Sequence, residues 1–134
     1  MLKIGDVASR TAVATEEVVA TFARISGDLN PVHLDESYAK DTIFGSRIAH
    51  GLWTASLISA VIGMELPGPG SIYLSQNMKF LSPVYIGDSV TAIVRVTAIR
   101  DDKPIVTLET LCVNQDKKHV LEGEAVVLFP ELRR

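Results

Sequence analysis

Two side chains capable of acid–base chemistry, Asp28 and His33, stand five residues apart in the segment DLNPVH. Asn30 precedes a proline, which disfavours helical backbone at Asn30 and favours a turn there. A turn can bring the carboxylate and the imidazole together, so that the pair can hold one water molecule and move its proton near neutral pH. The segment therefore predicts Asp28 and His33 as catalytic residues, with Asn30 holding the loop or the water. The alternative is that each is an ordinary turn residue.

Gly51 directly follows His50 and opens the longest apolar stretch of the chain, residues 51–65. This stretch predicts a helix, and the first N–H groups of a helix are free and carry a partial positive charge. Such donors can polarise a carbonyl and stabilise a developing oxyanion, while glycine lets a ligand approach the backbone closely. We therefore expect the Gly51 N–H to bind a substrate oxygen. The alternative is that Gly51 serves only for packing or capping.

A metal centre is an alternative use of the histidines. His33, Asp35 and His119 resemble a set of two histidines and one carboxylate. Such sites usually lie on a strand-rich barrel, in which a long apolar helix has no place, so we expect no metal. The single cysteine, Cys112, excludes an intrachain disulfide framework and a zinc site with several cysteines.

The composition narrows the function classes further. A chain of 134 residues with 47% hydrophobic and 22% charged residues is typical of one globular domain, here residues 1–134. The net charge of −3 offers no basic surplus for nucleic-acid binding. The first ten residues lack the apolar core of a secretion signal, which predicts a cytoplasmic protein. Residues 48–66 are apolar but contain several polar groups, so we expect a buried helix and not a membrane span.

Helical signals fill the first half of the chain and strand signals fill the second. After a short arm or edge strand in residues 1–14, Thr15 and Gly27 bracket a predicted helix over 16–26, and Asp35 could cap a short helical turn. Four β-rich stretches follow, spaced as in an antiparallel meander: residues 72–81, 89–99, 104–113 and 119–129. The order predicts an α+β fold in which a curved antiparallel sheet wraps around the one long apolar helix.

Several segments resemble one enzyme family. DLNPVH (28–33) resembles the D-x-N-P-x-H signature of the MaoC-like, (R)-specific enoyl-CoA hydratases, in which the aspartate and the histidine are the catalytic pair. His50-Gly51 matches the family's helix-opening His-Gly, and FLSPVYIGD (80–88) falls on its F-x-x-P-V-x-x-G-D pattern. The resemblance covers essentially the whole chain. It is strongest to the short, single-domain hydratases that feed polyhydroxyalkanoate synthesis.

The resemblance implies a hot-dog fold and a homodimer. It implies a hydro-lyase that adds water reversibly to a trans-2-enoyl-CoA and gives an (R)-3-hydroxyacyl-CoA, with no metal or organic cofactor. Three alternatives stay open on the same fold: a 3-hydroxyacyl-carrier-protein dehydratase, an acyl-CoA thioesterase and a non-catalytic acyl-CoA-binding module.

The acyl chain of such a substrate needs an apolar slot. Residues at helical spacing from Gly51 on the same face include Ala55, Ile58, Ser59 and Ile62. We expect Ala55, Ser59 and Ile62 to line the slot, the alternative being that they only pack against the sheet.

Overall fold

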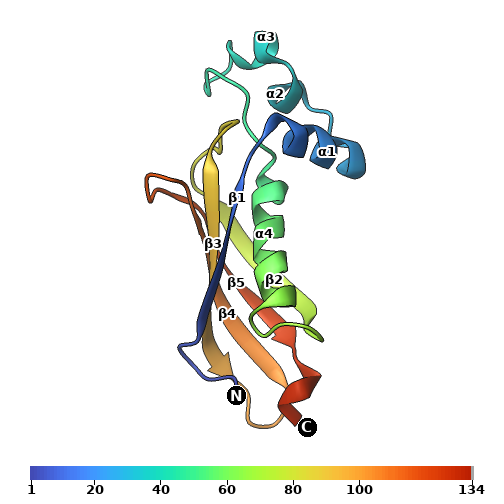
Figure 1. Cartoon of the computed structure of the whole chain (residues 1–134), viewed down its shortest axis with the longest axis vertical. Coiled ribbons are helices and arrows are strands. Elements are labelled where there is room, and N and C mark those ends of the chain that lie inside the picture. Colours follow the sequence, from blue (N-terminus) through green and yellow to red (C-terminus); the bar gives the residue numbers. More distant parts are fainter. Residues whose placement is uncertain (134) are drawn as a thin grey trace.

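The computed structural model of the protein describes residues 1–133, and it contains one curved antiparallel sheet with one long helix packed along it (Figure 1). The strands are β1 (Val7–Val13), β2 (Ile72–Phe80), β3 (Ser89–Ile99), β4 (Ile105–Val113) and β5 (His119–Leu128). The helices are α1 (Glu16–Ser26), α2 (Pro31–Leu34), α3 (Glu36–Ala39) and α4 (Gly51–Met64), followed by a final 3₁₀ turn (Pro130–Arg133). The predicted α+β hot-dog fold is confirmed.

The strand order differs from the predicted meander. The sheet runs β1-β3-β4-β5-β2, so β3, β4 and β5 do form a meander, but β2 lies beside β5 at one edge. The prediction that β2 adjoins β3 is wrong, because that side of β3 pairs with β1 from Val7↔Arg95 to Val13↔Ser89. Alternation of polar and apolar residues marks a strand but does not select its neighbour.

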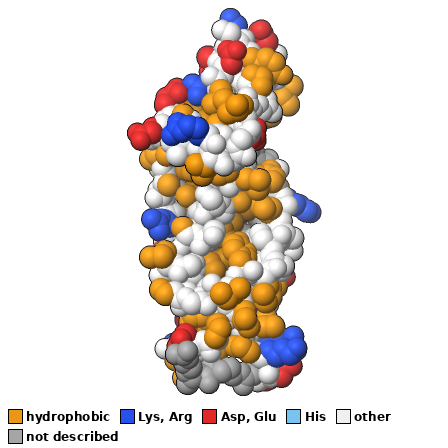
Figure 2. Space-filling view, turned by 90° about the vertical axis from the view of Figure 1, so that its right-hand side faces the viewer, with side chains coloured by type: hydrophobic (Ala, Val, Ile, Leu, Met, Phe, Trp, Pro, Cys, Tyr) orange, Lys and Arg blue, Asp and Glu red, His pale blue; other side chains and the backbone are white. Residues whose placement is uncertain are grey.

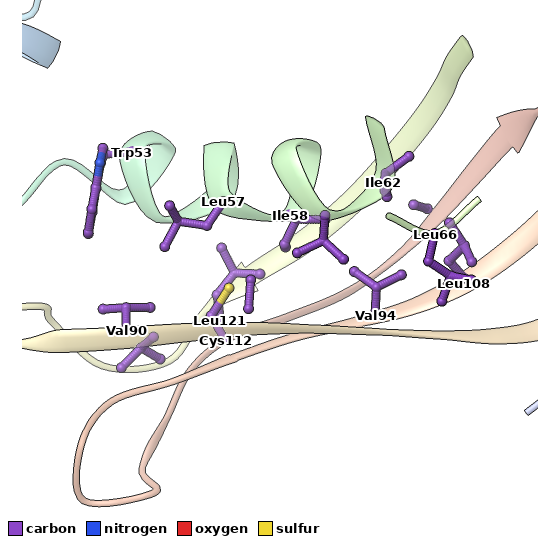
Figure 3. Packing of buried hydrophobic residues seen from close by; sticks show 14 of the residues in the cluster. Trp53, Leu57, Ile58, Ile62, Leu66, Val90, Val94, Leu108, Cys112 and Leu121 are labelled. Atoms are coloured by element: carbon purple, nitrogen blue, oxygen red, sulfur yellow. The ribbon is translucent and has the colours of Figure 1, made fainter. Parts of the chain in front are cut away.

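The core lies between α4 and the sheet. Figure 3 shows Trp53, Leu57, Ile58 and Ile62 on the side of α4 that faces the strands. Beneath them lie buried side chains of β3, β4 and β5: Val90, Val94, Leu108, Cys112 and Leu121. Burying apolar area stabilises a fold by about 25 cal/mol per Å², so this contact fixes α4 against the sheet.

Three short helices lie together at the N-terminal end of α4 (Figure 1). The Thr15 side chain accepts a hydrogen bond from the Val18 N–H at 3.1 Å, and Gly27 ends α1 in a left-handed conformation with φ 80°. Asp35 caps α3 by accepting from the Tyr38 N–H. These predicted caps are confirmed, and the chain between them brings the segment 28–33 to the start of α4.

Candidate active site

Asp28 and His33 face each other across a short gap. Asp28 Oδ2 lies 4.0 Å from His33 Nε2, too far for a direct hydrogen bond. His33 Nδ1 lies 2.8 Å from the backbone oxygen of Ile48, which can only accept, so Nδ1 carries the proton. In the neutral ring Nε2 is therefore an acceptor, and it is directed toward the carboxylate.

Burial is the main influence on the His33 imidazole. It lowers the His33 pKa below 6.5, because the ring loses the water that would solvate its charged form. The hydrogen bond to Ile48 and the charge of Asp28 oppose this shift, whereas the nearby His50 ring adds to it. His33 is thus predominantly neutral at pH 7 and can accept a proton at Nε2.

Asn30 holds the loop between the two residues. Its side-chain oxygen accepts from the Val32 N–H at 3.2 Å and caps α2, with Pro31 at the first helical position. Its own backbone N–H donates to Asp28 Oδ1 at 3.2 Å, which orients the carboxylate. The geometry therefore fits the supporting role expected for Asn30.

Gly51 begins α4 beside Asp28 and His33, which we call the dyad. Any residue larger than glycine at this position would force neighbouring atoms to move. A Cβ placed there would come within 2.7 Å of the Phe80 ring, which packs over the helix start. The first N–H groups of a helix have no acceptor within it, and Gly51 lines the same pocket as Asp28 and His33.

This pocket has a volume of about 620 Å³ and is otherwise mainly apolar. Its apolar walls come from α1 (Phe22), from residues 80–84 (including Phe80 and Val84) and from β5 (Val120). An apolar pocket with a few convergent polar groups suits a small apolar substrate with one polar end.

The structure does not bring the expected acyl-slot residues into this pocket. Ile62 is buried in the core, Ser59 is exposed, and Ala55 lines a separate groove between α4 and β2. The residues of α4 that line the pocket are Gly51, Leu52 and Thr54, the last directly before Ala55. The assignment of Ala55, Ser59 and Ile62 to an acyl slot stays a prediction.

Two further residues, His50 and Arg47, contact the segment 28–33. His50 Nε2 lies 3.0 Å from the backbone oxygen of Asp28, and the His50 ring stacks on His33. Arg47 Nε donates to the backbone oxygen of His33 at 2.8 Å, while Arg47 Nη1 donates to Glu16 at the start of α1. The sequence marked His50 only as half of the family-like His50-Gly51 pair, and it gave no role to Arg47.

The residues considered for a metal site, His33, Asp35 and His119, do not come together in the structure. Among the described residues, Asp28, His33 and His50 form the one cluster of possible ligands, all within 4.8 Å of one another. Each ring already uses one nitrogen in a hydrogen bond to a backbone oxygen, His33 Nδ1 to Ile48 and His50 Nε2 to Asp28. Asp35 instead caps α3, and His119 lies 2.7 Å from Glu122 on β5.

Across residues 1–133, the structure contains no helix that is both long and apolar enough to cross a bilayer. The apolar stretch 48–66 contains α4, a helix of 14 residues.

Fold and site together define a class of protein. A family model described as a MaoC-like domain matches residues 5–117, and the chain belongs to this family.

Individual relatives are similar over nearly the whole chain. An (R)-specific enoyl-CoA hydratase of Rhodospirillum rubrum is 48% identical over 129 residues, which are 96% of this chain and 89% of the relative. The solved structure of an Aeromonas caviae (R)-hydratase involved in polyhydroxyalkanoate biosynthesis superposes with a TM-score of 0.94 and is 47% identical, covering 96% and 98% of the two chains. A mitochondrial 3-hydroxyacyl-[acyl-carrier-protein] dehydratase of Arabidopsis thaliana is 37% identical, covering 98% of this chain and 80% of the relative.

Proposed function

We propose that the protein is an (R)-specific enoyl-CoA hydratase, which adds water reversibly to a trans-2-enoyl-CoA and gives an (R)-3-hydroxyacyl-CoA. The observation that carries this is the 4.0 Å separation of Asp28 Oδ2 and His33 Nε2. With hydrogen bonds of about 2.8 Å, one water can bridge the two atoms at an angle of about 90°, close to its own bond angle. Both atoms accept, so the water donates to both and turns a lone pair toward the pocket.

In this mechanism the thioester carbonyl lies at the start of α4, where its oxygen accepts from the Gly51 N–H. That hydrogen bond draws electrons from C3 and stabilises the enolate-like transition state, and one such donor can contribute ~10²–10³ in rate. The water oxygen bonds to C3 and passes a proton to the dyad, with Asp28 as the principal base. His33 orients the water and shares the transfer at Nε2, and the pair returns a proton to C2, so that one water is added overall.

An absorbance assay tests this proposal. Purified protein is mixed with crotonyl-CoA, and loss of the conjugated enoyl-thioester absorbance is followed with a thiol reagent present. We expect rapid loss without thiol release, unchanged by EDTA, because the proposed chemistry uses only protein groups. Thiol release would identify a thioesterase, and loss of activity with EDTA would restore the metal alternative.

A carrier-protein dehydratase is a second candidate, favoured by the similarity to the Arabidopsis relative over 98% of this chain. The reaction centre would be the same, but the acyl group would be attached to a carrier protein. Comparing kcat/KM for crotonyl-CoA and crotonyl-carrier protein separates the two, and a preference of tenfold or more for the carrier would establish the second.

We also propose a homodimer formed through the β2 edge. β2 has a free edge, and its Ile72, Leu74 and Phe80 are each about half exposed. Hydrophobic side chains form a band along this face of the molecule (Figure 2). Pairing with β2 of a second copy would cover both the apolar side chains and the open edge.

Light scattering after gel filtration tests the dimer. We expect a mass of two chains, and a single chain for Leu74→Lys, because a charge on an edge strand opposes pairing. Ile43→Lys, at an exposed residue between α3 and α4 and outside β2, is the matched control and should remain dimeric. A wild-type monomer would refute this part of the proposal.

The remaining parts of the proposal are a single domain over residues 1–134, a cytoplasmic location and a product that feeds polyhydroxyalkanoate synthesis. They rest on the resemblance to short hydratases and on the similarity to the Aeromonas caviae enzyme.

A further inference from the structure

His50 lies where four segments of the active site meet: α1, α2, the loop between them and the start of α4. It is only 2% exposed, and it occupies the N-cap position of α4 directly before Gly51. One face of its ring stacks on His33 of α2, with ring centres 3.8 Å apart. Phe22 of α1 lies 4.9 Å away at an angle of 50°. The His50 ring therefore contacts α1 and α2 while its own backbone begins α4.

The His50 imidazole makes its hydrogen bond to the catalytic loop and not to its own helix. No side-chain capping bond to α4 is present, although the residue is at the N-cap. Its Nε2 donates instead to the backbone oxygen of Asp28 at 3.0 Å, because that oxygen can only accept. Nδ1 is buried and has no hydrogen-bond partner among the described residues. The one hydrogen bond of this ring thus fixes the backbone of the residue proposed as the base.

The stack with His33 fixes the other half of the dyad. His33 Nδ1 is hydrogen-bonded to the backbone oxygen of Ile48, so the main motion left to the ring is rotation about this hydrogen bond. A flat ring 3.8 Å away limits that rotation and keeps Nε2 directed at Asp28. A purely apolar side chain could fill the same space, but it could not hold the Asp28 carbonyl.

We propose that His50 is a positioning residue, which holds the Asp28 backbone through Nε2–H and fixes the plane of the His33 ring by stacking. This inference rests on the proposed hydratase function and adds to it a residue that acts through both members of the dyad. Catalysis depends steeply on such placement, since a misplacement of about 1 Å can cost ~10²-fold in rate.

Two substitutions separate the two contacts. His50→Phe keeps a flat ring against His33 but removes the N–H donor. His50→Gln keeps an amide donor of similar reach but removes the ring. His119→Gln is the matched control, because His119 is half exposed on β5 and pairs with Glu122 outside the dyad pocket. For each variant, kcat and KM for crotonyl-CoA, the melting temperature and hydrogen–deuterium exchange of residues 28–34 are measured.

We expect kcat of His50→Phe to fall about 10–100-fold with KM changed less than about threefold, because placement and not binding is lost. His50→Gln should recover at least fivefold of that loss, and His119→Gln should match the wild type. Exchange of residues 28–34 should rise in His50→Phe and return toward the wild-type rate in His50→Gln.

A kcat of His50→Phe within twofold of the wild type would overturn the inference. It would also be overturned if His50→Gln were no better than His50→Phe, or if the loss followed the unfolded fraction at the assay temperature. The exchange measurement needs no turnover. A wild type that hydrates no enoyl thioester therefore refutes the proposed function, whereas unchanged exchange in His50→Phe refutes the positioning role.

Discussion

Replacing Asp28 by asparagine tests the dyad with little change in shape. The asparagine side chain keeps an oxygen that can accept the Asn30 N–H, now at 3.2 Å, so the loop keeps this bond. The side chain of Asp28 is 50% exposed, and a substitution at such a position changes the free energy of unfolding by about 0.5 kcal/mol or less. A neutral amide, however, cannot take a proton from the bridging water.

The expected loss follows from that chemistry. A positioned acid–base group contributes ~10²–10⁴ in rate, so kcat/KM of Asp28→Asn should fall by about this factor. This corresponds to about 3–5 kcal/mol in the barrier. His33 shares the same water, so the double variant Asp28→Asn/His33→Gln should be only slightly slower than the slower single variant.

Initial rates with crotonyl-CoA measure these losses, and thermal unfolding verifies that each variant is folded. Asp35→Asn is the matched control, because asparagine caps α3 as well as aspartate does. It should retain activity within about twofold. A loss of less than tenfold in Asp28→Asn, or equal losses in Asp28→Asn and Asp35→Asn, would refute Asp28 as the base.

Further predictions concern pH, loop placement and packing. Burial lowers the His33 pKa below 6.5, so the acid limb of kcat/KM should be centred below pH 6.5, and an acid limb centred above 6.5 would contradict this. The lowered His33 pKa also makes the free energy of unfolding depend on pH. This contribution is complete above the pKa of about 6.5 in the unfolded chain, and it decreases as pH falls from there to the lower pKa in the folded protein. Urea unfolding at several pH values measures it. Arg47→Ala should lower the free energy of unfolding by about 1–3 kcal/mol and reduce kcat, since the bonds to His33 and Glu16 are lost, and an unchanged urea midpoint would count against this. Gly123→Ala should cost about 1–3 kcal/mol or more, because its Cβ would lie 2.0 Å from the Asn77 backbone oxygen, whereas Gly63→Ala meets open space in α4 and should stabilise by about 0.5–1 kcal/mol.

Much of the local structure could be predicted from the sequence. Thr15, Asn30 and Asp35 each accept a backbone N–H two or three residues along the chain, so their capping depends on neighbours alone. The same holds for Pro31 at the start of α2. The spacing of Asp28 and His33 was informative for this reason, because one turn determines whether the two side chains meet.

The position of β2 beside β5, the contacts of His50 and Arg47, and the pocket-facing side of α4 could not be predicted in this way. β2 and β5 both alternate polar and apolar residues, and only packing against α4 and the competing β1 decides which edge each strand joins. Thr54 rather than Ala55 reaches the pocket because the rotation of α4 is set by side chains of strands 30 to 70 residues away.

The sequence by itself determined the spacing of the dyad, the helix caps and the apolar helix, because each depends on neighbouring residues or on a local hydrophobic pattern. Only the tertiary structure decided that a histidine 22 residues after Asp28 would hold its carbonyl and stack on His33. Such contacts join segments that are distant in the chain, and they form only when the sheet has fixed the place of α4.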